Sequence, residues 1–144
     1  MFGSSAVSAS TSPALTLKNN IFVNLSTPVG ATGYTVAYRR SSTTLTSYGA
    51  NSNNNLFFAG TPGANNLIFS NGTNLLQTLA NYKALSGLAP RDGLSVTENP
   101  TFISTTGSST DFLHINTVTP TKIESGGNPV SGITDDFDGN TRNV

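Results

Sequence analysis

The chain has 144 residues, with seven basic and seven acidic side chains and no cysteine. The balanced charge gives no electrostatic footprint for a phosphate backbone or an anionic membrane, and the lack of cysteine excludes disulfides and thiolate metal sites. Ser, Thr, Asn and Gly make up 70 residues, which is typical of short strands joined by many turns. No apolar run approaches the roughly 18 residues of a membrane span. We therefore expect neither a nucleic-acid partner nor a membrane span.

The first segment, residues 1–14, lacks the basic and continuous apolar regions of a signal peptide. We expect it to be a flexible N-terminal segment that precedes a folded part over residues 15–144. If the protein is exported, we expect the export signal to lie outside this chain.

A short motif recurs along the folded part. Asn-Asn precedes an apolar run in NNIFVN (19–24), NNLFFA (54–59) and NNLIFS (65–70), and NPTFIS (99–104) is a looser match. Such runs are too short for a helix and too uniformly apolar for a half-exposed strand, so they predict strands with neighbours on both sides. Asn tolerates the left-handed conformation at a bend and can form ladders where chain segments stack. The repetition favours stacked coils over unrelated turns.

Further strands are predicted over 15–26, 33–40, 43–49, 95–104 and 111–117, from β-prone residues and alternation. The one predicted helix is TLANYKALSG (78–87), with Thr78 as N-cap and Gly87 at its end. Leu79, Tyr82 and Leu85 would share its apolar face. A single short helix among strands predicts a decoration packed on a β core.

Four segments follow one another along the chain: NNIFVN, SNNNLFFAG, TLANYKALSG with DGLSVTENPTFIS, and the closing ITDDFDGNTRN. In this order they resemble segments of the extracellular right-handed parallel β-helix proteins of Bacteroidetes-type bacteria, which are pectate-lyase-like in fold. The resemblance covers residues 15 to 143. It implies an all-β fold, a right-handed parallel β-helix (solenoid) fragment with one short helix around 78–87. It also implies that residues 15–144 are C-terminal coils and an end cap, at the cell surface or outside the cell.

Only about three to five coils fit in this length, and a solenoid needs several stacked repeats with a cap. The segment that commonly follows the final Arg in the family is missing here, and so are the many upstream coils. The chain therefore looks like the C-terminal end of a longer protein, and upstream β-helix coils are an expected partner.

The closing stretch ITDDFDGNTRN raises the question of a metal site. Asp136, Asp138 and Asn140 alternate, but Gly139 comes too early for an EF-hand and no Glu follows. A looser calcium site from Asp135, Asp136 and Asp138 stays open as the one cofactor hypothesis. We favour a tight turn in which Gly139 takes positive φ and Arg142 neutralises a carboxylate.

Catalytic constellations are not assembled by the sequence, so no catalytic residue is predicted. Asp135 and Asp136 are neighbours and would point to opposite faces of a strand, which makes them a poor glycosidase pair. His114 is the only histidine, which leaves no triad and few ligands for zinc. Arg40 or Lys83 could interact with an acidic glycan, although paired strand arginines such as Arg39 and Arg40 are more often solvated.

Aromatic side chains give the candidate ligand site. Tyr34 and Tyr38 could stack on sugar rings beside Arg40, although packing in the core is the alternative. We predict a non-catalytic part of an extracellular or cell-surface protein that acts in adhesion or binds a polysaccharide or cell-surface glycan. The alternative is a truncated carbohydrate-active enzyme, a polysaccharide lyase or glycoside hydrolase, and a weaker one is an ice-binding or phage-fibre β-helix.

Overall fold

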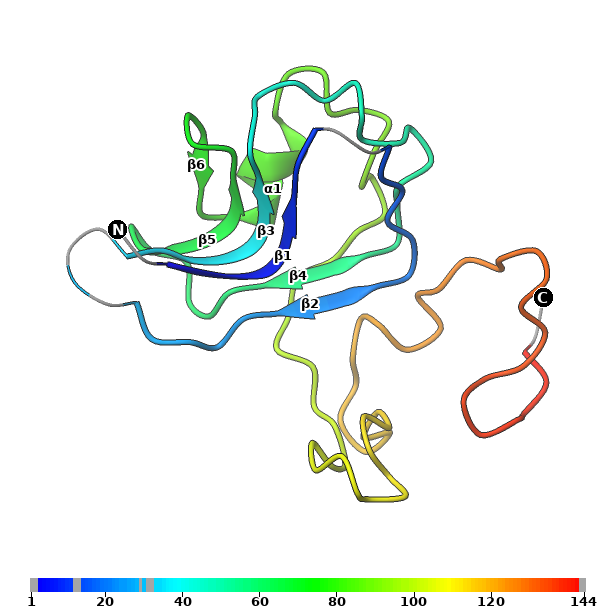
Figure 1. Ribbon diagram of the computed structural model, residues 1–144. Helices are drawn as coiled ribbons and strands as arrows, with labels where there is room; N and C mark the ends of the chain where they lie inside the picture. Colours follow the sequence, from blue (N-terminus) through cyan, green and yellow to red (C-terminus); the bar gives the residue numbers. More distant parts are fainter. Residues whose placement is uncertain (1–2, 12–13, 29, 31–32, 143–144) are drawn as a thin grey trace.

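The computed structural model describes residues 3–11, 14–28, 30 and 33–142. Its elements are strands with one short helix, which confirms the expected all-β class. They are β1 (Ser4–Ala9), β2 (Ile21–Val23), β3 (Thr35–Arg40), β4 (Leu56–Phe58), β5 (Asn66–Ser70), β6 (Leu75–Leu76) and α1 (Leu79–Lys83) (Figure 1).

Two sheets face each other across the core. One is mixed, in the order β1-β3-β5-β6, with β1, β3 and β5 parallel and β6 antiparallel at the edge; the other pairs β2 with β4 in parallel. Figure 1 shows β1, β3 and β5 side by side in one layer, with β4 and β2 adjacent in the other. The chain therefore alternates between the two layers as it advances.

The pairing register repeats along the chain. Ser4 pairs with Thr35 and Thr35 with Asn66, a spacing of 31 residues each time. Isolated parallel bridges join Leu15 to Tyr48 and Lys18 to Asn53, and a further one joins Leu56 of β4 to Val96. Each segment thus lies beside the segment that precedes it by about 31 to 40 residues, a length of chain that we call one circuit, and parallel strands of this kind need the long crossover connections that the sequence provides.

The Asn-Asn motif has two different positions in this arrangement. NNIFVN and NNLFFA lie next to each other as β2 and β4, with Ile21 paired to Leu56, 35 residues later. NNLIFS forms β5 in the other sheet and pairs with β3. The looser match, 99–104, lies outside every strand element and contributes only isolated bridges.

Stacked asparagines connect successive circuits where β2 and β4 begin. Asn19 and Asn54 both take the left-handed conformation, with φ of 56° and 57°. The next residues form the expected ladder, because Nδ2 of Asn20 donates to Oδ1 of Asn55 at 3.0 Å. The bend and ladder predicted for Asn are therefore confirmed at these two copies of the motif.

Aromatic rings fill the space between the sheets. Tyr38 of β3 is fully buried and lies 5.8 Å from the Phe57 ring and 5.5 Å from both Tyr48 and Phe69, centroid to centroid. Tyr82 of α1 closes the cluster at 4.9 Å from Phe69. Burying each such ring contributes roughly 1.5–3 kcal/mol, and offset or edge contacts add to this.

A buried carboxylate organises the polar side of this cluster. Asp92 has no exposed surface, and its Oδ2 accepts hydrogen bonds from the Tyr48 hydroxyl at 2.6 Å and the Tyr82 hydroxyl at 2.7 Å. Its Oδ1 accepts from Nδ2 of Asn55 at 3.0 Å and Oγ of Ser95 at 2.8 Å. Four donors from four parts of the chain therefore meet at one side chain.

The tyrosines of the core are held neutral by this environment. Burial raises the pKa of Tyr48 and of Tyr82 well above the ordinary range, and the charge of Asp92 adds to the shift. Burial also raises the pKa of Tyr38, although its hydrogen bond from Arg40 opposes the shift. Neutral hydroxyls are what Asp92 needs as donors.

The predicted helix is confirmed in type and N-cap but is shorter than expected. Thr78 accepts a hydrogen bond from the Asn81 amide at 3.2 Å, and Tyr82 and Leu79 are the buried side chains. α1 ends at Lys83, and Gly87 takes φ of 75° four residues later. The helix α1 contacts β5 and β6, so α1 covers one end of the core.

Several sequence expectations differ from the structure. We expected a flexible segment over residues 1–14, but Ser4–Ala9 forms β1 and pairs with β3; its Ser and Ala side chains are too small to give a hydrophobic signal. Residues 43–49, 95–104 and 111–117 form bridges and turns in place of the predicted strands. Alternation without a paired neighbour is not enough to make a strand.

Replacing the buried carboxylate tests its role in stability. Asp92→Asn keeps the shape and tolerates the φ of 54° found here, but its amide group would face two of the four donors. We expect a loss of about 2–4 kcal/mol in the free energy of unfolding, measured by urea titration. Asp111→Asn, at an exposed site, is the matched control and should change stability by less than about 0.5 kcal/mol. An equal, small effect of both substitutions would contradict the assigned role.

Candidate functional site

The C-terminal segment, residues 97–142, leaves the strand body and turns back toward β2 and β4 (Figure 1). No helix or strand element is present within it, and most of its residues are exposed. Its backbone is fixed by turns and by a few contacts to the strand body. Those contacts border an open cavity.

The left-handed asparagines hold this segment in place. Nδ2 of Asn19 donates to the Asn128 carbonyl at 2.7 Å, and the Asn128 amide donates back to Oδ1 of Asn19 at 2.9 Å. One circuit further along, Nδ2 of Asn54 donates to the Gly126 carbonyl at 3.0 Å. The same bend that starts β2 and β4 therefore aims two amides at one stretch of backbone.

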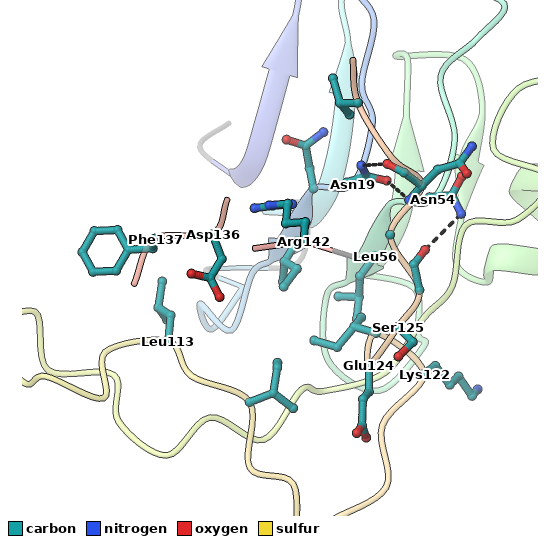
Figure 2. A pocket seen from close by; sticks show the side chains of 18 of the residues that line it. Asn19, Asn54, Leu56, Leu113, Lys122, Glu124, Ser125, Asp136, Phe137 and Arg142 are labelled. Carbon is teal, nitrogen blue, oxygen red and sulfur yellow. Dashed lines mark hydrogen bonds between the residues drawn. The ribbon is translucent and has the colours of Figure 1, made fainter. Parts of the chain in front are cut away.

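An open groove lies between the strand body and the C-terminal segment. Its volume is about 980 Å³, within the range of sites that bind organic ligands. In Figure 2, Asn19 and Asn54 lie on one side of this groove, with Leu56 beside them, while Asp136, Phe137 and Leu113 lie across from them. We call it the asparagine groove; it is lined on the strand side by Asn19, Asn20, Ile21, Asn54, Leu56, Leu94 and Val96, and on the other side by residues from 112–115, 122–130 and 133–142.

The floor of the asparagine groove is an apolar row. Ile21 pairs with Leu56, and Leu56 with Val96, so the three side chains follow one another at the spacing of adjacent strands. Ile21 is 44% exposed, which leaves part of the row open to a ligand. Amides of Asn19, Asn20 and Asn54 line the groove beside it.

Two polar atoms in the groove have no hydrogen-bond partner among the described residues. They are Oδ1 of Asn54, an acceptor, and Nε2 of His114. Nε2 of His114 lies 3.0 Å from Oδ2 of Asp138 but outside hydrogen-bonding geometry, so this contact is an ion pair only when the imidazole is protonated. Both atoms are buried and belong to residues that line the groove.

Glu98 fixes the part of the wall that contains Lys122 and Ile123. Its carboxylate accepts from the Thr121 hydroxyl and from the Lys122 amide at 2.8 Å and 3.0 Å. Partial burial would raise the pKa of Glu98, but these hydrogen bonds, that from the Ile123 amide and the Lys122 charge together lower it. The wall therefore depends on an ionised side chain.

The three side chains proposed as a calcium site, Asp135, Asp136 and Asp138, do not share a common set of contacts. Oδ1 of Asp136 accepts from the amides of Asp138 and Asn140 at 3.0 Å and 2.8 Å, and these bonds hold the pKa of Asp136 below its usual range. Gly139 has φ of 80°, as the turn predicts, whereas Nε of Arg142 donates to the Asp135 carbonyl, not to a carboxylate. Among the described residues no group of three or more acidic or histidine side chains is arranged to hold a metal ion.

The residues predicted to bind a ligand are split between core and surface. Tyr38 is fully buried in the aromatic cluster, and Arg40 is only 2% exposed. The terminal nitrogens of Arg40 donate to Oη of Tyr38, the Thr44 carbonyl and Oγ of Ser47, and its guanidinium lies 5.6 Å from the centre of the Tyr48 ring. Tyr34 and Arg40 both line a second cavity of about 570 Å³ beside Arg39.

Sequence reasoning found Tyr34, Arg40, Asp136 and Asp138 but missed other residues that line these two cavities. Asn19 and Asn54 carry the motif signal, but nothing in the sequence shows that they bind the backbone of 126–128. Arg39 was set aside as one of a solvated pair, and Asn71 carried no signal. The pairing of His114 with Asp138 joins positions far apart in the sequence and depends on the path of the C-terminal segment.

Acid should loosen the wall that Glu98 holds. Because its pKa is lowered in the folded chain, its contribution is complete above the ordinary value of about 4.3 and is lost as pH falls below it. We expect the amide-exchange protection factors of Lys122 and Ile123, measured by NMR, to drop between pH 5 and pH 3. The Phe57 amide, bonded to the Val96 carbonyl, is the internal control and should stay protected.

The variant Glu98→Gln should remove this pH dependence and give weaker protection of the Lys122 amide already at pH 7. Unchanged protection of Lys122 across the acid range in the unsubstituted chain would contradict the assignment.

Comparison of the chain with protein-family models, curated proteins and solved structures gave no match. Within the described residues, no helix has the length and apolar character needed to cross a membrane. A family assignment for this chain therefore depends on its sequence motifs and on the geometry given above.

Proposed function

We propose that this chain is a set of coils from a right-handed parallel β-helix of the extracellular, pectate-lyase-like type. The equal spacing of β1, β3 and β5, the in-register pair β2-β4 and the isolated parallel bridges support it. Right-handed connection follows from the general rule for parallel crossovers. In this proposal the circuits start at residues 4, 35 and 66, and residues 97–142 lie against their side.

The two ends of the stack differ, which bears on the expected upstream partner. At one end, β6 turns back antiparallel on β5, and α1 contacts both strands. At the other end, β1 and β2 have a paired neighbour on one side only among the described residues. Exposed strand edges recruit further strands, so we propose that additional coils stack on the β1 and β2 edge, while β6 and α1 cap the opposite end.

The function that the geometry supports best is non-catalytic binding of a glycan in the asparagine groove, at the cell surface or outside the cell. The observation that carries the proposal is the apolar row Ile21, Leu56 and Val96 beside the asparagine amides. Sugar rings present C–H faces rimmed by hydroxyl groups. An apolar row, open at Ile21 and continued by the buried Leu56, accepts the faces, and Oδ1 of Asn54, which has no partner among the described residues, accepts a hydrogen bond at the rim.

The repeat of the stack suits an extended ligand. Ile21, Leu56 and Val96 follow one another at the spacing of parallel strands, about 4.8 Å, and bent asparagines precede the first two. A polysaccharide that lies across these strands would meet an apolar residue at each step. Further coils on the β1 and β2 edge would lengthen this surface, which would fit adhesion to a polymer.

A second candidate function, cleavage of the bound glycan, is favoured by one observation. His114 and Asp138 face each other in the same groove at 3.0 Å, and such a pair can transfer protons. Asp136 is not available for this role because its carboxylate accepts three hydrogen bonds within its own turn. We rank binding first because this contact alone supports cleavage.

Glycan binding is tested by shortening the apolar row where it is exposed. A glycan array would identify the preferred oligosaccharide, and calorimetry would then measure its affinity for the unsubstituted chain and for Ile21→Ser. We expect the substitution to weaken binding about five- to tenfold, because it removes apolar area from the contact. Leu25→Ser is the matched control, since Leu25 is also exposed but lies outside the groove, and it should bind normally.

Equal affinities of both variants, or no binding to any glycan, would contradict the proposal. Release of shortened product by the unsubstituted chain, lost in Asp138→Asn, would replace binding by cleavage as the function.

A further inference from the structure

The second cavity lies on the outer side of the sheet β1-β3-β5, away from the asparagine groove. Arg39 of β3 is paired in register with Ser8 of β1 on one side and Ser70 of β5 on the other. Three adjacent strands therefore place one serine on each side of Arg39. Tyr34, half-buried, stands at the start of β3 and lines the same cavity.

Three residues that line this cavity have a buried side-chain donor without an acceptor. Asn71 is 5% exposed, and its Oδ1 accepts from the Thr73 amide and from the amide and side chain of Asn74. These bonds fix the orientation of its amide, and Nδ2 is left with no partner. Nε of Arg39 and Nε of Arg40 are also buried without a partner. Buried donors are rarely left unpaired, so an absent acceptor is expected here.

The charge of the cavity is one-sided. Arg39 and Arg40 line it together with Ser8, Ser41, Ser70 and Asn71, and no Asp or Glu is among its lining residues. The terminal nitrogens of Arg40 are engaged with the core, whereas Arg39 has no ion pair among the described residues. Two cations of a neutral chain are thus placed together without an anion.

We infer that this cavity, formed by Ser8, Tyr34, Arg39, Arg40, Ser70 and Asn71, binds an oxyanion group, either a carboxylate or a sulfate ester. The planar guanidinium of Arg39 suits either group through its Nε and a terminal nitrogen, and the Asn71 amide and the serine hydroxyls supply further donors. The volume of about 570 Å³ exceeds what a lone ion needs and admits a sugar ring beside Tyr34. The inference rests on the proposed function only for the carrier of the anion, a glycan.

Calorimetry with the purified chain tests the site with three probes: sodium sulfate, a sulfated oligosaccharide and an oligomer of a uronic acid. We expect at least one charged oligosaccharide to bind, and its affinity to fall as salt is added. Arg39→Gln removes the charge, and Asn71→Asp keeps the oxygen that caps the turn while it replaces the unpaired donor by an acceptor. Each should lower the affinity at least tenfold.

Lys18→Gln is the matched control, because it removes one positive charge at an exposed position outside the cavity, and it should stay within twofold of the unsubstituted chain. Normal affinity of Arg39→Gln and Asn71→Asp, an equal loss in Lys18→Gln, or no binding of any probe would overturn the inference. Urea titration confirms that each variant is folded.

The site and the proposed glycan function can fail separately. Ile21→Ser, in the asparagine groove, should leave binding of the charged probes unchanged. Binding of sulfate alone, as tight as that of the oligosaccharides and lost in Arg39→Gln, would support the anion site while it removes the glycan as carrier. Binding of neutral glycans with no charged probe bound would overturn the anion site and leave the groove intact.

Discussion

A buried carboxylate that accepts four hydrogen bonds sets the relative positions of three circuits of the chain. Asp92 is bonded to Tyr48 and Asn55 of the second circuit, to Tyr82 of the helix and to Ser95 at the end of the third. Asn55 in turn is bonded to Asn20 and to the Leu17 carbonyl of the first circuit. A buried charge is costly unless its partners are in place, so a different register of these circuits would deprive Asp92 of the donors from Tyr48 and Asn55.

Everything on the outside of the molecule follows from that register. Because Asn20 stacks on Asn55, the preceding Asn19 and Asn54 point outward together and bind the backbone of 126–128. The same register puts Ile21, Leu56 and Val96 in one row, and on the opposite layer it places Arg39 between two serines. Both cavities therefore result from one stacking arrangement, and they lie on two different faces of the molecule.

Much of this arrangement could be predicted from the sequence because its signals are local. The Asn-Asn motifs, the alternation in β3 and the cap of Thr78 depend on neighbouring residues. The repetition of the Asn-Asn motif favours segments that stack. β1 could not be predicted, since Ser and Ala carry little hydrophobic signal and the strand exists through its pairing with β3. The predicted strands over 95–104 and 111–117 had the right composition, but their pairing is limited to isolated bridges, of Val96 with Leu56, Phe102 with Ile115 and Ser104 with Phe112.

The candidate site residues also differ in how far local sequence determines their positions. Tyr38 and Arg40 have the residue types of a sugar-binding surface, but their positions in β3 turn them into the aromatic core. Tyr34, three residues before Ala37, stays at the surface. Arg39 and Asn71 line a cavity. The position of Arg39 depends on which side of β3 meets solvent, and that of Asn71 depends on one turn. Local sequence does not determine either.

Disulfide trapping tests the stacked register most directly, because the chain contains no cysteine of its own. The pair Ile21→Cys with Leu56→Cys occupies partner positions on adjacent parallel strands, where Cα atoms are about 4.8 Å apart and a disulfide can form without strain. Ile21→Cys with Phe58→Cys is shifted by two residues and should be beyond disulfide reach. Under mild oxidation, peptide mapping should find the cross-link in the first pair and free thiols in the second. Equal cross-linking of both pairs, or cross-linking of the shifted pair alone, would contradict the stacking on which the account depends.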